Sequence, residues 1–209
     1  MNTQDILQSI TAVQASVLRH EPDIEELDRA IGDGDHFINV RRGCEVMVEL
    51  SPSLQGLAPS DALNRIGMKL LSTIGGASGP LISSFFLSMA TSLKGIETPN
   101  RAQFAAAFTA GVDAIKSRGK ADLGEKTMLD TLIPVSRLLV RLNEEGASLA
   151  DLCAAAKLEA TQGMQATRDM IATKGRAHFL GERAIGHIDP GSKTCEVAIH
   201  AVCDLMTSR

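Results

Sequence analysis

Residues 1–20, MNTQDILQSITAVQASVLRH, carry apolar side chains at helical spacing. Ile6, Ile10, Val13 and Val17 follow one another at intervals of four, three and four positions. An α-helix turns once in about 3.6 residues, so these four side chains share one face of a helix. We therefore predict that the chain begins with an amphipathic helix whose apolar face packs on a core.

The same period recurs along most of the chain and resumes with Val40, Cys44 and Met47. Further helices are predicted at about residues 60–74, 79–94, 101–117, 127–144, 148–172 and 194–207. No segment alternates apolar and polar residues as a half-buried strand does. The pattern predicts a single all-α domain over residues 1–209, with seven to nine helices.

Residues typical of helix ends support these boundaries. In each of the pairs Asn100–Gln103 and Ser148–Asp151, the two side chains are expected to cap each other's backbone at a helix start. Left-handed closing residues are predicted at Gly119 and Gly146. The loops that stand out between the helices are 28–39, 75–80, 118–128 and 174–193. Alternate loops of an up-and-down helical array lie at the same end, so one site can combine several of them.

Composition narrows the classes of function. Aromatic residues make up 3% of the chain, all of them Phe, and the formal net charge is −4. Base stacking requires aromatic platforms and phosphate tracking requires a basic face, so no nucleic-acid partner is expected. A polyanionic ligand would need metal ions or local hydrogen-bond donors to offset the negative charge of the protein.

Nothing in the sequence indicates export or a membrane partner. The first residues lack the pattern of a signal peptide, and no apolar run approaches the ~18 residues of a membrane span. The four cysteines form no metal-binding or disulfide pattern and are interpreted as small apolar residues, three of them on apolar helix faces. The chain is expected to be cytoplasmic.

Residues 27–39, LDRAIGDGDHFIN, form the densest cluster of reactive side chains. Two glycines allow a turn that aims Asp33 and Asp35 at one point, and Asp28 precedes them by about one helical turn. Convergent carboxylates repel one another unless a cation lies among them, and their oxygens suit magnesium or calcium. An EF-hand that begins at Asp33 is excluded, because its twelfth position would require Glu and holds Cys44.

A simpler interpretation of the same cluster stays open. Asp33 and Asp35 could form only a turn and a cap for the helix after His36. Asp28 is expected to lie too early in the sequence to cap that helix. The two interpretations therefore differ in whether Asp28 and Asp35 bind a metal ion.

Two further loops carry candidate phosphate contacts. Residues 74–80, IGGASGP, lead into a helix, and glycines before a helix N-terminus expose N–H groups to an anion. No Lys-Ser or Lys-Thr follows at Walker A spacing, and an ordinary interhelical loop is the alternative. In residues 174–191, KGRAHFLGERAIGHIDPG, Arg176 could make a forked contact with phosphate and Asp189-Pro190-Gly191 predicts a turn.

These three segments and RGKADLGEKTMLDTLIP, residues 118–134, resemble the successive signatures of the L subunit of dihydroxyacetone kinase. They occur in that family's order and span essentially the whole chain. The resemblance implies an up-and-down barrel of about eight antiparallel helices. It implies that two magnesium ions are bound by Asp28, Asp33 and Asp35. It places ADP or ATP against His36, Asn39, Ala77, Ser78, Gly119, Met128, Arg176, Asp189, Pro190 and Gly191.

Two residues depart from the family pattern. Phe37 stands where the family usually has Gly, and it is expected to reshape the nucleotide's cover or the partner surface. Lys193 follows the Asp189–Gly191 turn, where a smaller or uncharged residue is usual. Its side chain is expected to point to solvent, and a contact with phosphate is the alternative.

The resemblance implies a kinase subunit that transfers a phosphoryl group to a short-chain ketose, with dihydroxyacetone or a tetrulose as acceptor. The ketose would be held on a separate K subunit, and an M subunit of phosphotransferase type would rephosphorylate resident ADP. Arg176 is the candidate catalytic group. The alternatives are a nucleotide-loaded module that acts on a transcription regulator and a relative of fatty-acid kinase nucleotide domains.

Overall fold

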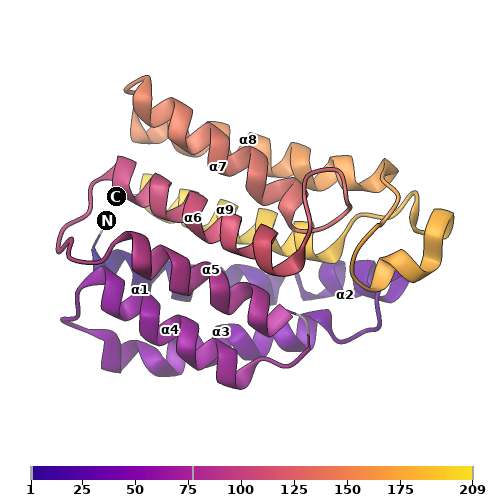
Figure 1. Cartoon of the computed structure of the whole chain (residues 1–209), viewed down its shortest axis with the longest axis horizontal. Helices are drawn as coiled ribbons and strands as arrows, with labels where there is room; N and C mark the ends of the chain where they lie inside the picture. The colour runs from indigo at the N-terminus through magenta and orange to yellow at the C-terminus, as the bar shows by residue number, and fades with distance from the viewer. Residues whose placement is uncertain (1, 77, 209) are drawn as a thin grey trace.

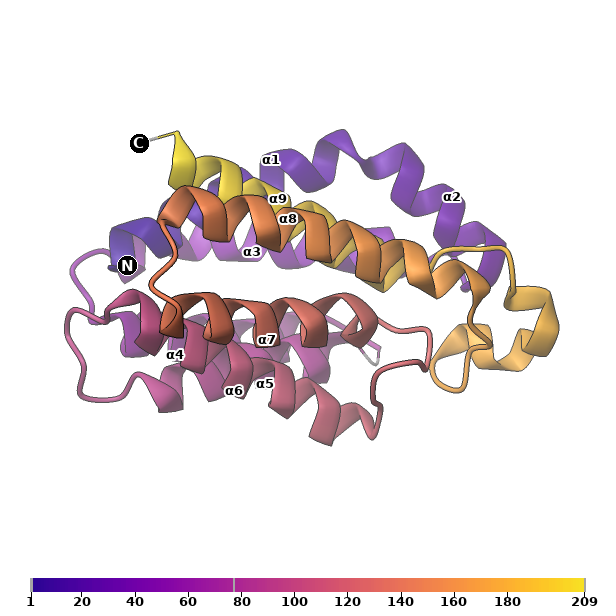
Figure 2. The ribbon, with the colours of Figure 1, turned by 90° about the horizontal axis from the view of Figure 1, so that it is seen from above.

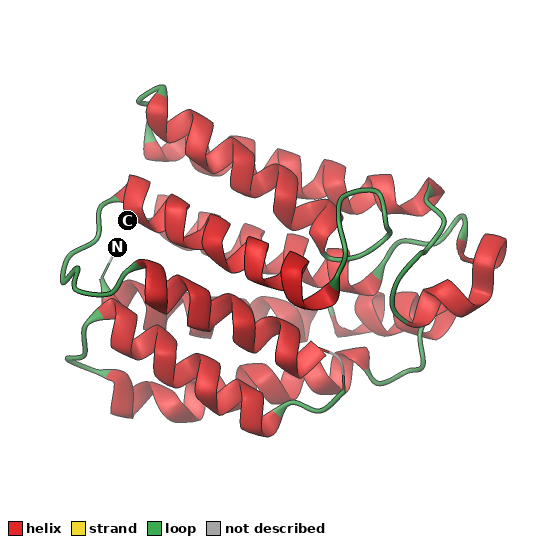
Figure 3. Cartoon of the chain, in the orientation of Figure 1, coloured by secondary structure: helices red, strands yellow, loops and turns green. Residues whose placement is uncertain are grey.

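The computed structural model describes residues 2–76 and 78–208 of the chain. This part of the chain consists of helices and connecting loops and contains no β-strand (Figure 3). Its α-helices are α1 (Thr3–Arg19), α2 (Glu21–Ile31), α3 (His36–Leu54), α4 (Pro59–Thr73), α5 (Ser78–Ser92), α6 (Arg101–Gly119), α7 (Leu129–Glu144), α8 (Leu149–Ala166) and α9 (Pro190–Thr207). Two 3-10 segments, η1 (Thr167–Asp169) and η2 (Arg176–Ala184), follow α8. The predicted all-α class is confirmed.

The α-helices form a closed up-and-down barrel. From α3 to α9 each helix packs against the next, and α1 packs against both α3 and α9 and closes the ring (Figures 1 and 2). Helices α1 and α2 run in the same direction and occupy one position of the ring. Eight antiparallel positions result, as the family resemblance implied.

The bend between α1 and α2 lies at His20, which ends one helix and precedes the next. The His20 ring bonds back to the Ser16 carbonyl at 2.8 Å from Nδ1. Pro22 in the first turn of α2 has no N–H, and a missing donor is tolerated only at a helix start. The chain therefore restarts a helix here without reversing its direction.

The predicted helix caps are confirmed at α6 and half confirmed at α8. Asn100 accepts the N–H of Gln103 at 2.9 Å, and Gln103 accepts the N–H of Asn100 at 2.8 Å. Ser148 Oγ likewise accepts the N–H of Asp151 at 3.1 Å. The Asp151 carboxylate, however, accepts from the Ser148 hydroxyl at 2.6 Å instead of the backbone.

Two predicted helix ends were wrong. The left-handed residue after α6 is Lys120, with φ 47°, and Gly119 is the last residue of the helix. Helix α8 ends at Ala166 rather than at 172, because the chain tightens there into η1. Gly146, with φ 73°, closes α7 as predicted.

Aliphatic side chains fill the barrel, and a few Phe side chains connect neighbouring clusters of its core. Phe85 packs edge-to-face on Phe86 and on Phe108, with ring centroids 5.3 and 5.4 Å apart, and it contacts two of the core clusters. Phe37 is 2% exposed and packs with Val17 and Val197. The expectation that Phe37 reshapes the nucleotide's cover or the partner surface was therefore wrong, since its ring belongs to the core.

The chain termini and the loops of interest lie at opposite ends of the barrel (Figure 1). Cys44, Cys153 and Cys203 are buried and Cys195 is partly buried, and all four are free thiols. No helix within residues 2–76 and 78–208 is both long and apolar enough to cross a bilayer.

Candidate functional site

Four connections meet at the end of the barrel opposite to the termini (Figure 1). They are the turn between α2 and α3, the connection from α4 to α5, the loop between α6 and α7, and the segment from η1 to α9. This gathering follows from the alternating helix directions, as the sequence predicted. Ala77 lies outside the described residues.

Asp28 is a buried carboxylate that caps a helix from a distance. It is 4% exposed, and its Oδ2 accepts the N–H of His36, the first residue of α3, at 2.9 Å. The expectation that Asp28 lies too early to cap this helix was wrong, because the turn at 32–35 folds α2 back against the start of α3. A Cβ on Gly32 would lie 1.7 Å from Asp28 Oδ1, so only glycine leaves room for this carboxylate.

Asp35 occupies the position before α3 but does not cap it. Its side chain makes no capping hydrogen bond, which removes the main support for a purely structural role of this residue. Loss of water contact raises the pKa of Asp35, and the adjacent carboxyls of Asp33 and Asp28 raise it further. Three carboxyl groups therefore repel one another in this turn.

Arg176 reaches this acidic turn from η2. Its Nε lies 2.7 Å from Asp33 Oδ2, with 70% of the Arg176 side chain exposed. The loop predicted to contact phosphate and the loop predicted to bind metal are thus in contact through opposite charges. Such an exposed pair contributes little stability, so a ligand can separate it at low cost.

The acidic turn is not arranged as a finished metal site. Within residues 2–76 and 78–208, no three Asp, Glu, His or Cys side chains are placed to hold one ion. Asp28 is turned toward the His36 N–H and Asp33 toward Arg176. The chemistry of the donors fits a hard cation, because the turn collects carboxylates whose repulsion such an ion would relieve. The ligand set stays a prediction.

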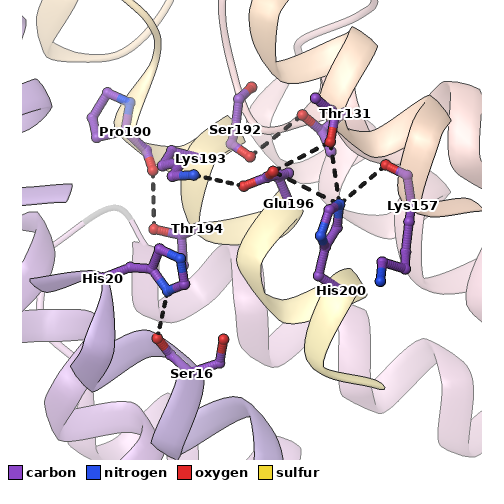
Figure 4. Close-up of polar contacts among 11 residues, drawn as sticks. Ser16, His20, Thr131, Lys157, Pro190, Ser192, Lys193, Thr194, Glu196 and His200 are labelled. Atoms are coloured by element: carbon purple, nitrogen blue, oxygen red, sulfur yellow. Dashed lines mark hydrogen bonds and ion pairs between the residues drawn. The ribbon is translucent and has the colours of Figure 1, made fainter. Parts of the chain in front are cut away.

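His36 connects the acidic turn to the start of α9. Its Nε2 lies 2.9 Å from Thr194 Oγ1, and the Thr194 hydroxyl donates to the Pro190 carbonyl at 2.9 Å (Figure 4 shows the second bond). Burial lowers the pKa of His36, although the Asp28 and Asp35 carboxylates oppose this effect. Asn39, one turn later, donates from Nδ2 to the Asp35 carbonyl at 3.0 Å.

Asp189 caps α9 and is held in place by η1. Its Oδ2 accepts the N–H of Ser192 at 2.7 Å, and its own N–H donates to Thr167 Oγ1 at 3.0 Å. Burial raises the pKa of Asp189 to about 7. A Cβ on Gly191 would lie 3.5 Å from the Met128 Cβ, so the Asp189–Gly191 turn and Met128 are neighbours.

Ser78 and Gly119 lie at the ends of two adjacent helices. Ser78 is the first residue of α5, with its hydroxyl 3.5 Å from the Gly75 carbonyl. A Cβ on Gly119, at the end of α6, would lie 3.3 Å from the Leu81 side chain of α5. Gly79 packs directly on the Ile74 carbonyl, where a Cβ would lie 2.2 Å away. This tight turn explains the glycine at that position.

Lys193 does not point to solvent, as the sequence had suggested. Its side chain is 17% exposed, and Nζ lies 2.8 Å from Glu196 Oε2 (Figure 4). Glu196 also accepts from Thr161 of α8 at 3.3 Å, and the His200 ring lies 3.2 Å from the same hydroxyl. Lys193 therefore neutralises a glutamate that lies in the contact between α8 and α9.

Sequence reasoning missed the polar residues that connect the loops behind the site. The largest is Lys126, which is 1% exposed, followed by Asp130, Thr131, Thr167 and Ser192. The only signal was that charged residues stand next to apolar ones in GEKTMLD, residues 124–130. That pattern is equally typical of an exposed loop, so it could not identify them.

The fold and this end of the barrel define a class: all-helical domains that bring an acidic turn, a glycine-rich turn and an arginine-bearing loop together. A family model described as the DAK2 domain matches residues 30–204. The chain belongs to the DAK2 domain family, which confirms the resemblance seen in its motifs.

Several relatives are similar over most of their length. The chain is 42% identical to the Escherichia coli K12 protein named PEP-dependent dihydroxyacetone kinase, ADP-binding subunit DhaL, over 79% of each chain. It is 43% identical to the PTS-dependent counterpart of Lactococcus lactis, over 82% of this chain and 81% of that one.

A solved structure supports the fold comparison. The dihydroxyacetone kinase of C. freundii, crystallised with AMP-PNP and Mg2+, superposes with a TM-score of 0.74 and 26% identity. The match covers 95% of this chain and 33% of that longer chain. The barrel therefore corresponds to one third of that kinase.

Proposed function

We propose that this chain is the ADP-binding subunit of a dihydroxyacetone kinase that draws its phosphoryl groups from phosphoenolpyruvate. The observation that carries the proposal is the 42–43% identity to two subunits so named, over 79–82% of this chain. The same four loops that carry the family motifs meet at one end of the barrel.

Asp28, Asp33 and Asp35 would hold magnesium, two ions in the pattern of the family. Magnesium would offset phosphate charge that a protein of net charge −4 cannot offset by itself. The crowded carboxyls of the acidic turn support this assignment, because burial and then the neighbouring carboxyls of Asp33 and Asp28 raise the pKa of Asp35.

The remaining assigned residues position the nucleotide. Arg176, exposed and paired with Asp33, can exchange that carboxylate for a phosphate oxygen and donate two hydrogen bonds. The N-terminus of α5 at Ser78 offers backbone N–H groups to a phosphate. Met128 and the turn at Gly191 form adjoining surfaces for the rest of the nucleotide. Gly119, His36 and Asn39 complete the set of nucleotide contacts that the family motifs assign.

Phosphoryl transfer requires positioning and charge neutralisation more than covalent chemistry from the protein. In this proposal the ketose is bound by a separate K subunit, which also supplies the base that accepts the hydroxyl proton. An M subunit of the phosphotransferase type returns ADP to ATP on this chain. The division of labour makes this chain a nucleotide carrier that is inactive without its partners.

Reconstitution tests the proposal. The purified chain loaded with MgADP is combined with a K subunit, an M subunit and a phosphoenolpyruvate-fed phosphoryl source, and dihydroxyacetone phosphate is measured. Product is expected only when all components are present. Turnover by the chain alone with ATP and dihydroxyacetone would contradict the division of labour. Tight MgADP binding without any transfer in the complete mixture would favour the regulatory module.

A further inference from the structure

Lys126 is a buried lysine without a direct carboxylate partner among the ion pairs of the described residues. Its Nζ donates to the carbonyls of Thr167 and His187, each at 2.5 Å. Its backbone takes a left-handed conformation with φ 59°, which non-glycine residues adopt rarely. Burying an ammonium costs several kcal/mol unless hydrogen bonds compensate, so this arrangement requires both carbonyls.

The loop around Lys126 is fixed from its other side by Asp130. This carboxylate is 1% exposed and accepts the N–H groups of Gly124 at 2.5 Å and Thr127 at 2.7 Å. From α9, Ser192 Oγ donates to the Thr127 carbonyl at 2.7 Å. Residues 124–128 are therefore bonded to α7, η1 and α9 at once.

Both acceptors of Lys126 belong to segments that position the start of α9. The Thr167 hydroxyl accepts the N–H of Asp189, and His187 lies two residues before Asp189. The ammonium group thus joins the loop that ends at Met128 to the segment that ends at the Asp189–Gly191 turn. These are two of the surfaces assigned to the nucleotide.

We propose that Lys126 is a positioning residue that fixes the 124–128 loop against the 187–191 turn before nucleotide binds. The inference rests on the proposed function, because the nucleotide is the ligand whose site is prepared. Lys126 does not touch the nucleotide in this arrangement. It acts through the neighbouring residues Met128 and Gly191, which lie so close that a Cβ added to the glycine would be 3.5 Å from the Met128 Cβ.

The test compares MgADP affinity of the wild-type chain and the Lys126→Met variant by calorimetry. Methionine keeps the apolar stem and removes the ammonium, so the helices should persist while the two loops separate. We expect affinity to fall by about tenfold or more, with a near-wild-type helical circular-dichroism spectrum. Amide exchange without nucleotide should speed up at residues 124–128 and 185–191 but not in α4 and α5.

Two controls separate positioning from a general loss of stability. Leu152→Ala removes a buried side chain near the start of α8, at the far end of the barrel, and should lower stability with unchanged MgADP affinity. Lys157→Met removes a lysine of α8 that is paired with Asp204 of α9 and should leave the affinity unchanged as well. If Lys126→Met fails to fold, Ser192→Ala breaks the bond to Thr127 from the α9 side and should weaken MgADP binding severalfold.

The possible results are distinguishable from failure of the proposed function. If the wild-type chain does not bind MgADP, the proposed function itself is wrong. If the wild type binds and Lys126→Met or its substitute Ser192→Ala binds equally well, with unchanged loop exchange, the positioning role is overturned and the proposed function stands.

Discussion

Asp28 and Asp35 differ in what their carboxylates contact, and this difference makes separate tests of capping and metal binding feasible. Asp28 is buried and bonded to the first N–H of α3, whereas Asp35 makes no capping bond. A substitution at Asp28 changes a helix cap together with any metal ligand. A substitution at Asp35 leaves that cap intact and changes the charge of the turn and the side-chain hydrogen bonds of Asp35 with Asp33 and Asn39.

Asp35→Asn is therefore predicted to weaken magnesium–ADP binding without loss of stability. Asparagine keeps the shape of the side chain but cannot supply the negative charge that a magnesium ligand contributes. We expect at least a tenfold loss of affinity, about 1.4 kcal/mol, measured by calorimetry. The melting temperature without ligand should not fall, because removal of one carboxyl relieves repulsion from Asp33 and Asp28.

Asp28→Ala provides the matched comparison. This variant should lose both a carboxylate that binds the metal ion and the cap of α3. An unsatisfied N–H at the start of α3 lowers the free energy of unfolding by about 1–3 kcal/mol. Wild-type nucleotide affinity together with unchanged stability in Asp35→Asn would instead favour a purely structural role of Asp35, because asparagine caps a helix about as well as aspartate.

At the scale of elements, α7 and α8 approach each other unusually closely at Gly163. A Cβ on Gly163 would lie 2.4 Å from the Asp130 carbonyl oxygen and 3.0 Å from the Thr131 Cα. Pro134 lies four residues after Asp130 within α7 and has no N–H to bond this carbonyl. This carbonyl faces α8, and glycine allows α8 to pack against it.

Gly163→Ala is predicted to destabilise the protein. An alanine in a helix normally stabilises relative to glycine, but here the added methyl meets backbone atoms that cannot turn aside. We expect the free energy of unfolding to fall by about 1–3 kcal/mol in denaturant titrations. In the control Gly43→Ala the methyl meets only the end of the Ile74 side chain, so the loss should be smaller. A Gly163→Ala variant as stable as wild type would contradict the close approach.

The N-terminus of α9 carries a pH dependence. The pKa of Asp189 is raised from 3.8 to about 7, mainly by burial, with a smaller contribution from the Asp130 carboxylate, while hydrogen bonds from Ser192 and the charge of Lys126 oppose the shift. The folded protein therefore holds a proton between about pH 4 and 7 that the unfolded chain releases. This contribution to stability is present at low pH and is lost as the pH rises toward 7.

Asp189→Asn removes that dependence, since asparagine also caps helices but does not ionise. The difference in the free energy of unfolding between the variant and the wild type should therefore shift in favour of the variant when the pH is raised from 5 to 8. Urea titrations of both proteins without nucleotide at the two pH values measure the difference. A stability difference that is the same at pH 5 and pH 8 would show that Asp189 ionises normally in the folded protein.

At the scale of the whole molecule, the site end joins segments far apart in the chain, and a ligand there should stabilise the entire barrel. At concentrations of ~100 to 1,000 times the dissociation constant, MgADP binding adds roughly 3–4 kcal/mol to the free energy of unfolding. For a domain of this size each kcal/mol raises Tm by about 2–4 °C. Melts with MgADP should therefore lie several degrees above melts with ADP and EDTA. Equal melting temperatures would count against the metal site.

The amino-acid sequence by itself determined the features that depend on neighbours within about one helical turn. The spacing of Ile6, Ile10 and Val13 predicted the first helix, and the Asn100–Gln103 cap formed as its spacing required. Hydrogen bonds and apolar faces of this kind link residues three or four positions apart, so their pattern is visible in the chain. The resemblance to the family, seen in its motifs, further predicted that the barrel has about eight antiparallel helices.

Only the tertiary structure decided which charges are buried and what they contact. Asp28 caps α3 because a turn returns it to His36, and Lys126 bonds carbonyls 41 and 61 positions away. Phe37 and Lys193 also turned inward, toward partners supplied by other helices or by the next turn. The reason is physical: a buried polar group is stable only where closure of the barrel brings its hydrogen-bonding partners, and that closure cannot be read from local spacing.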